Sequence, residues 1–361
     1  MNNILSGMPL GELTDLLMPL PRFRAAQIFK WIASGICRFE DMGNLPAALR
    51  QELAGRFFLR PDAAAQQFPG EDGTVKLAIR FADGAGIEAV LLPGSSRRKT
   101  APSGYTACLS TQAGCPAGCV FCKTGSLGFL RNLSSAEMVE QFLQLHKAAE
   151  ERLPPQAPPI RPIASIVVMG MGEPLLNLAE LRRALEVITS PAGIHFSKRR
   201  ITVSTCGIAA GIVDLADNGP AVRLALSLTA ADESLRRRLM PFSRGHGLAE
   251  IREACGYFQK KGGGRITLEV VLLGGINTSG EDAAGIAKFA AGLDAAVNLI
   301  PWNPVPGLEF EGKPLRPPSA AEVNGFKGRL EAMGLQVTCR FRRGRSVMGA
   351  CGQLGQLNKN G

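Results

Sequence analysis

Through roughly the first 60 residues, hydrophobic positions recur every three to four residues, which is the spacing of a helix face. The segments RFRAAQIFKWIASG and NLPAALRQELAGRFF show it best, and Gly35 stands where the first of these helices is expected to end. Two strand-like runs, TVKLAIRF and IEAVLLP, then flank the turn signal ADGAG. We therefore predict a helical accessory domain over residues 1–62, and a β-hairpin with a connecting loop over residues 63–104.

From Tyr105 onward, apolar strand-like runs alternate with helix-like segments. One helix-like segment, SSAEMVEQFLQLHKAAEE, begins with Ser134 or Ser135 as a capping residue. Strands that alternate with helices predict a parallel sheet in an α/β barrel or partial barrel, here spanning residues 105–341. The six runs are YTACLS, ASIVVMG, ITVSTC, AVRLALSL, RITLEVVLL and AVNLIP. We predict that residues 342–361 form a separate C-terminal segment.

Charge and cysteine usage narrow the class of protein. The chain has 361 residues, a net charge of +10 and nine cysteines, with a pI near 9.4. We expect a cytoplasmic protein without a membrane partner, because no signal sequence opens the chain and no apolar run reaches the roughly 18 residues of a membrane span. An odd number of cysteines in a long chain indicates reduced thiols. The positive charge favours a polyanionic partner, although an ordinary basic protein has the same composition.

Four basic clusters could form a nucleic-acid face, or could be solvated surface runs. They are residues 97–99, 198–200, 236–238 and 340–345.

Three cysteines lie within eight residues in CPAGCVFC, at Cys115, Cys119 and Cys122. On a helix they would share one buried face. However, Gly114, Pro116 and Gly118 disfavour a helix, by roughly 1 kcal/mol for each Gly and about 3 for the Pro. A wrapped loop that turns three thiolates toward a metal centre fits the sequence better. Three cysteines do not complete a structural zinc site, which needs four protein ligands, whereas a 4Fe-4S cluster held by three thiolates keeps one iron open for a small molecule.

Four further unusual stretches follow predicted strands, and in a parallel barrel such loops meet on one rim. They are MGMGEPLLN, STCG, SLTA and IPWNPVPG. In MGMGEPLLN the glycines allow close approach of a ligand to the backbone, and Glu173 could pair with an amino group. Taken alone, that stretch could equally be a tight turn between a strand and a helix.

The whole chain resembles the RlmN/Cfr family of radical S-adenosylmethionine RNA methyltransferases, and the RlmN branch more than the Cfr branch. The resemblance rests on RAAQIFKWIASG, FEDMGNLP, STQAGCPAGCVFCKTGSLGFLRNL, GMGEPLLN, ITVSTCG, LIPWNPVPG and GACGQL. It implies a six-unit (β/α)6 partial TIM barrel with an N-terminal helical domain. It also implies a 4Fe-4S cluster, S-adenosyl-L-methionine, and methylation of adenine at carbon 2 in RlmN or carbon 8 in Cfr. The implied partners are 23S ribosomal RNA, transfer RNA as a further substrate, and an electron donor such as flavodoxin or ferredoxin. We expect a monomer.

The resemblance also assigns roles to single residues. Cys351 in GACGQL is the implied methyl carrier, Cys108 is its partner thiol in a transient disulfide, and Glu88 is the implied proton acceptor. The remaining cysteines, at positions 37, 206, 255 and 339, are expected to be structural. The implied cofactor contacts are Gly172, Glu173, Ser204, Ser227, Leu228, Thr229 and Asn303.

One position departs from the family pattern, because Thr229 stands where the family usually has His. The loop between Glu88 and Cys108 also looks longer than the family's. Two alternatives remain open at the level of sequence: methylation at carbon 8, and a non-catalytic, metal-bearing RNA-binding protein.

Overall fold

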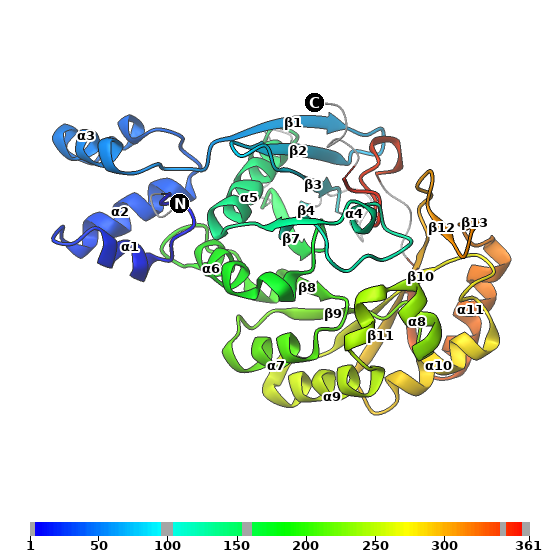
Figure 1. Cartoon of the computed structure of the whole chain (residues 1–361). Helices are drawn as coiled ribbons and strands as arrows, with labels where there is room; N and C mark the ends of the chain where they lie inside the picture. The colour runs from blue at the N-terminus through cyan, green and yellow to red at the C-terminus, as the bar shows by residue number, and fades with distance from the viewer. Residues whose placement is uncertain (1–3, 95–103, 154–160, 340–343, 356–361) are drawn as a thin grey trace.

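The computed structural model describes residues 4–94, 104–153, 161–339 and 344–355. Its centre is a ten-stranded sheet in the order β1-β2-β3-β4-β7-β8-β9-β10-β11-β14 (Figure 1). From β1 to β4 the neighbouring strands are antiparallel, and from β4 to β14 they are parallel. The strands are β1 Ala63–Pro69, β2 Val75–Phe81, β3 Gly86–Leu92, β4 Tyr105–Cys108, β7 Ile163–Val168, β8 Ile201–Thr205, β9 Arg223–Ser227, β10 Ile266–Leu272, β11 Ala295–Pro301 and β14 Gln336–Cys339. Two small antiparallel pairs lie outside this sheet: β5 Gln112–Gly114 with β6 Phe129–Asn132, and β12 Glu309–Phe310 with β13 Lys313–Pro314.

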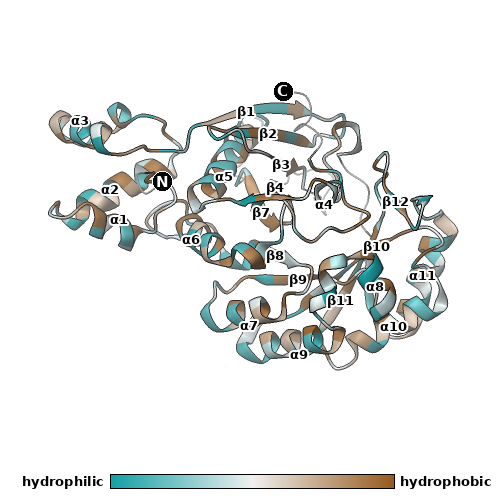
Figure 2. Ribbon diagram, in the orientation of Figure 1, coloured by the Kyte–Doolittle hydropathy of each residue, from teal (hydrophilic) through white to brown (hydrophobic). Residues whose placement is uncertain are grey.

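Helices connect the parallel strands and turn their apolar faces toward the sheet (Figure 2). The first long one, α5, begins at the capping box of Ser134 with Glu137, as the sequence predicts. The connecting helices are α4 Lys123–Ser126, α5 Ser135–Glu150, α6 Leu178–Thr189, α7 Ala209–Asn218, α8 Glu233–Leu239, α9 Leu248–Phe258, α10 Gly280–Ala290 and α11 Ala320–Ala332. No helix in the described ranges combines the length and the apolar character needed to cross a membrane.

Three helices, α1 Leu10–Leu16, α2 Arg22–Ala33 and α3 Ala47–Arg56, form the N-terminal end of the molecule (Figure 1). They share one continuous apolar core with the sheet and its helices, in which Phe29 of α2 and Phe142 of α5 are both about 1% exposed. Arg60 ties this end to α5, because its guanidinium contacts Glu140 at 2.6 Å through each of two nitrogens.

The structure confirms the α/β class, the N-terminal helices, the hairpin and the six parallel strands. Gly35 indeed follows α2, with a φ of 80°. Two strands of the central sheet were missed, as were the two small antiparallel pairs. In the central sheet β1 extends the hairpin and β14 adds a seventh parallel strand, so that the sheet is open and consistent with a partial barrel. The hairpin is a continuation of the central sheet. The division into four domains stays a prediction.

Candidate active site

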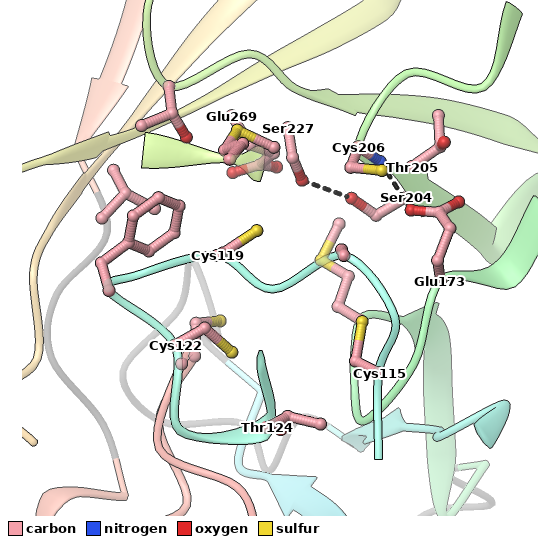
Figure 3. A pocket seen from close by; sticks show the side chains of 18 of the residues that line it. Cys115, Cys119, Cys122, Thr124, Glu173, Ser204, Thr205, Cys206, Ser227 and Glu269 are labelled. Atoms are coloured by element: carbon pink, nitrogen blue, oxygen red, sulfur yellow. Dashed lines mark hydrogen bonds between the residues drawn. The ribbon is translucent and has the colours of Figure 1, made fainter. Parts of the chain in front are cut away.

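Cys115, Cys119 and Cys122 lie in a non-helical loop between β5 and α4, so the helix-face interpretation is wrong. Gly114 opens the loop at a φ of 77°, and a Cβ there would lie 2.0 Å from the carbonyl oxygen of Gly128. Only glycine fits where these two segments of the chain come so close together. The turns that follow bring all three thiols to the lining of one pocket (Figure 3).

The pocket is formed at the carboxyl ends of the parallel strands, as predicted for the rim of a barrel. It has about 980 Å³ of empty space, its open mouth included. Besides the three cysteines, predicted residues from four other strands line it: Gly172 and Glu173 after β7, Ser204 in β8, Ser227 and Thr229 at the end of β9, and Asn303 after β11. Leu228, the remaining predicted contact, is buried between Ser227 and Thr229 and is not part of the lining.

Glu173 is buried in the wall of the pocket, beside Cys206 (Figure 3). Its two carboxylate oxygens accept hydrogen bonds from the backbone N–H of Leu175, at 3.1 Å, and of Cys206, at 2.7 Å. Burial raises the pKa of Glu173, against the opposing effect of the hydrogen bond from Cys206. A cationic amino group bound here would offset the cost of burying the carboxylate.

Burial also shifts the pKa values of the three thiols. It raises the pKa of Cys115 to about 12 and raises the pKa values of Cys119 and Cys122. The thiols are therefore protonated until a metal replaces their protons. Within the described ranges, no three His, Cys, Asp or Glu side chains are close enough to hold a single ion. An iron–sulfur cluster does not require the three thiolates to meet at one ion, since each thiolate binds its own iron.

Two buried polar atoms in the pocket wall point to a polar ligand. Among the described residues, Thr229 Oγ1 and Asn303 Oδ1 are buried without a hydrogen-bond partner, although nearly all such atoms in folded proteins have one. At Gly172 the φ is 102°, and a Cβ would lie 2.6 Å from Cβ of Gln112. Three thiols, a buried carboxylate, unpartnered polar atoms and close-packed glycine backbone fit a cluster with S-adenosylmethionine beside it.

The C-terminal segment 344–355 crosses this pocket and brings Cys351 to its lining. The carbonyl oxygen of Cys351 accepts a hydrogen bond from Asn303 Nδ2 at 3.2 Å, and that of Gly352 accepts one from the backbone N–H of Lys123 at 2.8 Å. Thr124 Oγ1 donates to the carbonyl oxygen of Leu354 at 2.8 Å. The implied methyl carrier is thus held against the loop that carries the cluster cysteines.

Glu88 and Cys108, the other two implied catalytic residues, do not line the pocket. Both are buried. Val90 of β3 pairs with Cys108 of β4, so Cys108 and Glu88, two residues before Val90, lie on one face of the sheet. Glu88 reaches the C-terminal segment, because its Oε2 accepts a hydrogen bond from the N–H of Gly355 at 2.7 Å. No disulfide joins any of the nine cysteines, all of which lie within the described ranges.

The sequence did not predict two titratable residues of the pocket lining. Cys206, expected to be structural, lines the pocket beside Glu173, and burial raises its pKa. Glu269 of β10 also lines it, and one of its oxygens accepts a hydrogen bond from Asn298 at 2.6 Å. The signal for Glu269 was present in the sequence as an acid in the middle of the apolar run RITLEVVLL.

Two of the basic clusters, residues 198–200 and 236–238, lie wholly within the described residues. Arg236 is fully buried and donates to the backbone carbonyl oxygens of Cys206 and Leu228, so its assignment to a surface cluster is wrong. Residues 198–200 are exposed but precede β8, at the end of the sheet away from the pocket. Residues 97–99 and 340–343 lie outside the described residues, as do residues 95–103 of the loop expected to be long.

Comparisons with known proteins agree with this geometry. Residues 109–290 match the Radical SAM superfamily, and residues 5–59 match the ribosomal RNA large subunit methyltransferase N-terminal domain. The chain is 46% identical over 351 residues to a probable dual-specificity RNA methyltransferase RlmN of Treponema denticola, covering 97% of this chain and 95% of that protein. A relative with the same description from Thermus thermophilus is 42% identical over 347 residues, or 96% of this chain and 92% of that protein.

A solved structure gives the same result. The crystal structure of a radical SAM methyltransferase from Sphaerobacter thermophilus matches with a TM-score of 0.87 and 37% identity, over 98% of this chain and 99% of that chain. The family's cofactors are a 4Fe-4S cluster and S-adenosylmethionine, which the pocket fits. With its fold, its cysteine loop and nearly its whole length in common with these relatives, the chain belongs to the RlmN family of radical S-adenosylmethionine RNA methyltransferases.

Proposed function

We propose that this protein methylates carbon 2 of adenosine in 23S ribosomal RNA, and in transfer RNA, through a methyl group carried on Cys351. The observation that carries the proposal is the position of Cys351, which lines the same pocket as the three cysteines of the loop. A thiol there lies where a cofactor's methyl group can be transferred to it. The description of the relatives as dual-specificity RNA methyltransferases supports two classes of RNA substrate.

The residues would divide the work as follows. Cys115, Cys119 and Cys122 hold the cluster, while Glu173, Ser204, Ser227, Thr229 and Asn303 surround S-adenosylmethionine, with Gly172 and Leu228 shaping the backbone around it. When bound, the cluster and S-adenosylmethionine supply one-electron chemistry, which is required because an aromatic ring carbon is a poor nucleophile. Cys351 carries the one-carbon unit to the adenine, and Glu88 accepts the ring proton. The thiolate of Cys108 then attacks the sulfur of Cys351 and breaks the bond between that sulfur and the transferred carbon. A disulfide forms between the two cysteines, and the methylated base leaves and takes up a proton.

The release step joins Cys108 and Cys351 in a transient disulfide, which is not formed in this structure. We further propose that the enzyme is a monomer and that an electron donor such as flavodoxin or ferredoxin reduces it.

The nature of the product tests the proposal. Anaerobically reconstituted protein would be incubated with S-adenosylmethionine, a reductant and ribosomal RNA from a strain that lacks the modification, followed by mass spectrometry of the digested RNA. We expect 2-methyladenosine. The formation of 8-methyladenosine without the 2-isomer would contradict the proposal and favour the Cfr-type reaction instead.

A further inference from the structure

A buried lysine lies beside the proposed proton acceptor. Lys76 of β2 pairs with Val90 of β3, and Val90 in turn pairs with Cys108 of β4. Paired residues in an antiparallel sheet point to the same face, and so do residues two apart along one strand. Lys76, Glu88 and Cys108 therefore lie on one face of the sheet, although they come from three different strands.

Lys76 is in contact with Glu88. Its Nζ lies 3.3 Å from Glu88 Oε1, and the two side chains are only 5% and 2% exposed. The ammonium also lies 5.9 Å from the centre of the Phe68 ring, on the neighbouring strand β1. The second carboxylate oxygen of Glu88 is the one that accepts the hydrogen bond from Gly355. Lys76 therefore contacts one carboxylate oxygen of Glu88, and the C-terminal segment contacts the other.

Such a pair has little value for stability. The cost of removing two charges from water can exceed their mutual attraction, and apolar replacements of buried ion pairs are often neutral or stabilising. A carboxylate buried without a counter-charge, in contrast, is strongly disfavoured in its ionised form, which is the form that can accept a proton. The pair therefore fits a functional requirement at Glu88 better than a structural one.

We propose that Lys76 is a positioning residue, whose ammonium balances the buried charge of Glu88 and fixes its carboxylate on the face shared with Cys108. Lys76 takes no proton from the substrate and acts only through Glu88. This inference rests on the proposed function, in which Glu88 accepts the ring proton. Cys108 of β4 and the exposed Arg80 of β2 share the face of the sheet that carries Glu88. The backbone N–H of Glu88 donates to the sulfur of Met171, and its carbonyl oxygen accepts a hydrogen bond from Ser110 Oγ.

The test compares variants of the reconstituted holoenzyme with ribosomal RNA as substrate. Lys76→Met and Lys76→Gln remove the charge, Lys76→Arg keeps it, and Lys288→Met removes an exposed lysine of α10 as a matched control. We expect Lys76→Met to lower kcat for methyladenosine formation by about tenfold or more, as part of the 10²–10⁴-fold that a general base contributes. KM for RNA should stay unchanged, Lys76→Arg should recover most of the rate, and Lys288→Met should match the wild type.

A double variant separates this proposal from the proposed function. If Lys76 acts through Glu88, then Lys76→Met lowers the rate no further in a Glu88→Gln background. An inactive Glu88→Gln with a fully active Lys76→Met, or additive losses in the double variant, would overturn the role of Lys76 alone. A fully active Glu88→Gln would overturn the proposed role of Glu88. Failure of both uncharged variants to fold, judged by thermal unfolding, would assign Lys76 to stability and also overturn the inference.

Discussion

Thr229 adopts a backbone conformation that is rare for its residue type. Its φ is 56°, in the left-handed region, which β-branched residues seldom adopt and which costs of order 1–3 kcal/mol. Its backbone N–H donates to the carbonyl oxygen of Glu269, and its carbonyl oxygen accepts a hydrogen bond from Asn277 Nδ2. Its hydroxyl has no partner among the described residues. Strain of this kind concentrates at functional sites, so the replacement of the family's usual His still leaves a residue positioned to contact a ligand.

Thr229→Val removes the hydroxyl while keeping the shape and the backbone strain. We expect the protein without cofactors to keep its thermal unfolding temperature or to gain slightly, because the hydroxyl makes no internal hydrogen bond. Affinity for S-adenosylmethionine should fall by about 0.5–1.5 kcal/mol, the net value of one hydrogen bond. Thermal unfolding and calorimetric binding are the measurements. A lower unfolding temperature with unchanged affinity would show that the hydroxyl serves the fold.

At the residue scale, the sequence predicted those site residues that lie close together in the chain. Cys115, Cys119 and Cys122 lie within eight residues, and Glu173 lies in a distinctive glycine-rich stretch. Cys206, Glu269 and Lys76 were missed because their roles depend on neighbours that come from other strands. The pairing of Lys76 with Glu88, for example, requires the register of β2 against β3.

At the scale of elements, strands with strong apolar runs were predictable and polar ones were not. The sequence of β1, AAAQQFP, is mostly exposed and ends in proline, and that of β14, QVTC, contains little apolar surface. Both are edge strands of the sheet, where one side lacks a partner strand and the apolar signal is weakest.

The link between the N-terminal helices and α5 depends on Arg60, which also donates to the carbonyl oxygen of Gly35 at 2.7 Å. Arg60→Met leaves the buried Glu140 without its cation, and we expect a loss of about 3–5 kcal/mol in the free energy of unfolding. The matched control is Arg56→Met, which breaks the exposed pair with Glu52 and should cost under about 1 kcal/mol. Denaturant unfolding measures both. Equal losses in the two variants would contradict the importance of the link between Arg60 and Glu140.

Glu322 stabilises the start of α11 in a pH-dependent way. Its carboxylate accepts hydrogen bonds from Arg316 and from the backbone of Ser319 and Gly275. The hydrogen bonds from Arg316 contribute most to a pKa well below the usual 4.5. A carboxyl whose pKa is lowered on folding stabilises the protein above its unfolded pKa, and this contribution is lost as the pH falls toward the folded pKa.

Glu322→Gln should therefore cost about 1 kcal/mol at pH 7, the size of a lost helix cap. The difference from the wild type should stay constant down to about pH 5 and shrink at lower pH. Thermal unfolding across this range is the measurement. A difference that grows on acidification would have the wrong sign for this account.

At the scale of the whole molecule, the C-terminal segment is the feature that local patterns could least predict. Gly355 donates a hydrogen bond to Glu88, although the two residues are 267 positions apart in the sequence. Only the resemblance to the family connected Cys351 with the cysteine loop before the fold was known. The structure adds the hydrogen bonds that hold the segment there: Lys123, Thr124 and Asn303 donate to it, and Glu88 accepts from it.

The exposed residues Lys198, Arg199 and Arg200 lie at the end of the sheet away from the pocket, so they can contact only RNA that extends around the molecule. Reversing Lys198 and Arg199 to Glu should weaken RNA binding and lower the salt slope by about 1 for each phosphate that is no longer neutralised. Cofactor cleavage should not change, and neither property should change when Lys288 and Lys313 are reversed instead. Unchanged affinity and salt slope would remove residues 198–200 from the RNA footprint.

The most direct test of the account compares the two thiols proposed to act in sequence, using Cys351→Ala and Cys108→Ala enzymes with labelled S-adenosylmethionine and ribosomal RNA. Cys351→Ala should assemble the cluster but neither acquire a methyl group nor modify RNA. Cys108→Ala should accumulate a covalent protein–RNA adduct, visible as a gel shift that RNase removes, because a thiol needed only for release cannot prevent attachment. Full activity in both variants would contradict a methyl carrier at Cys351.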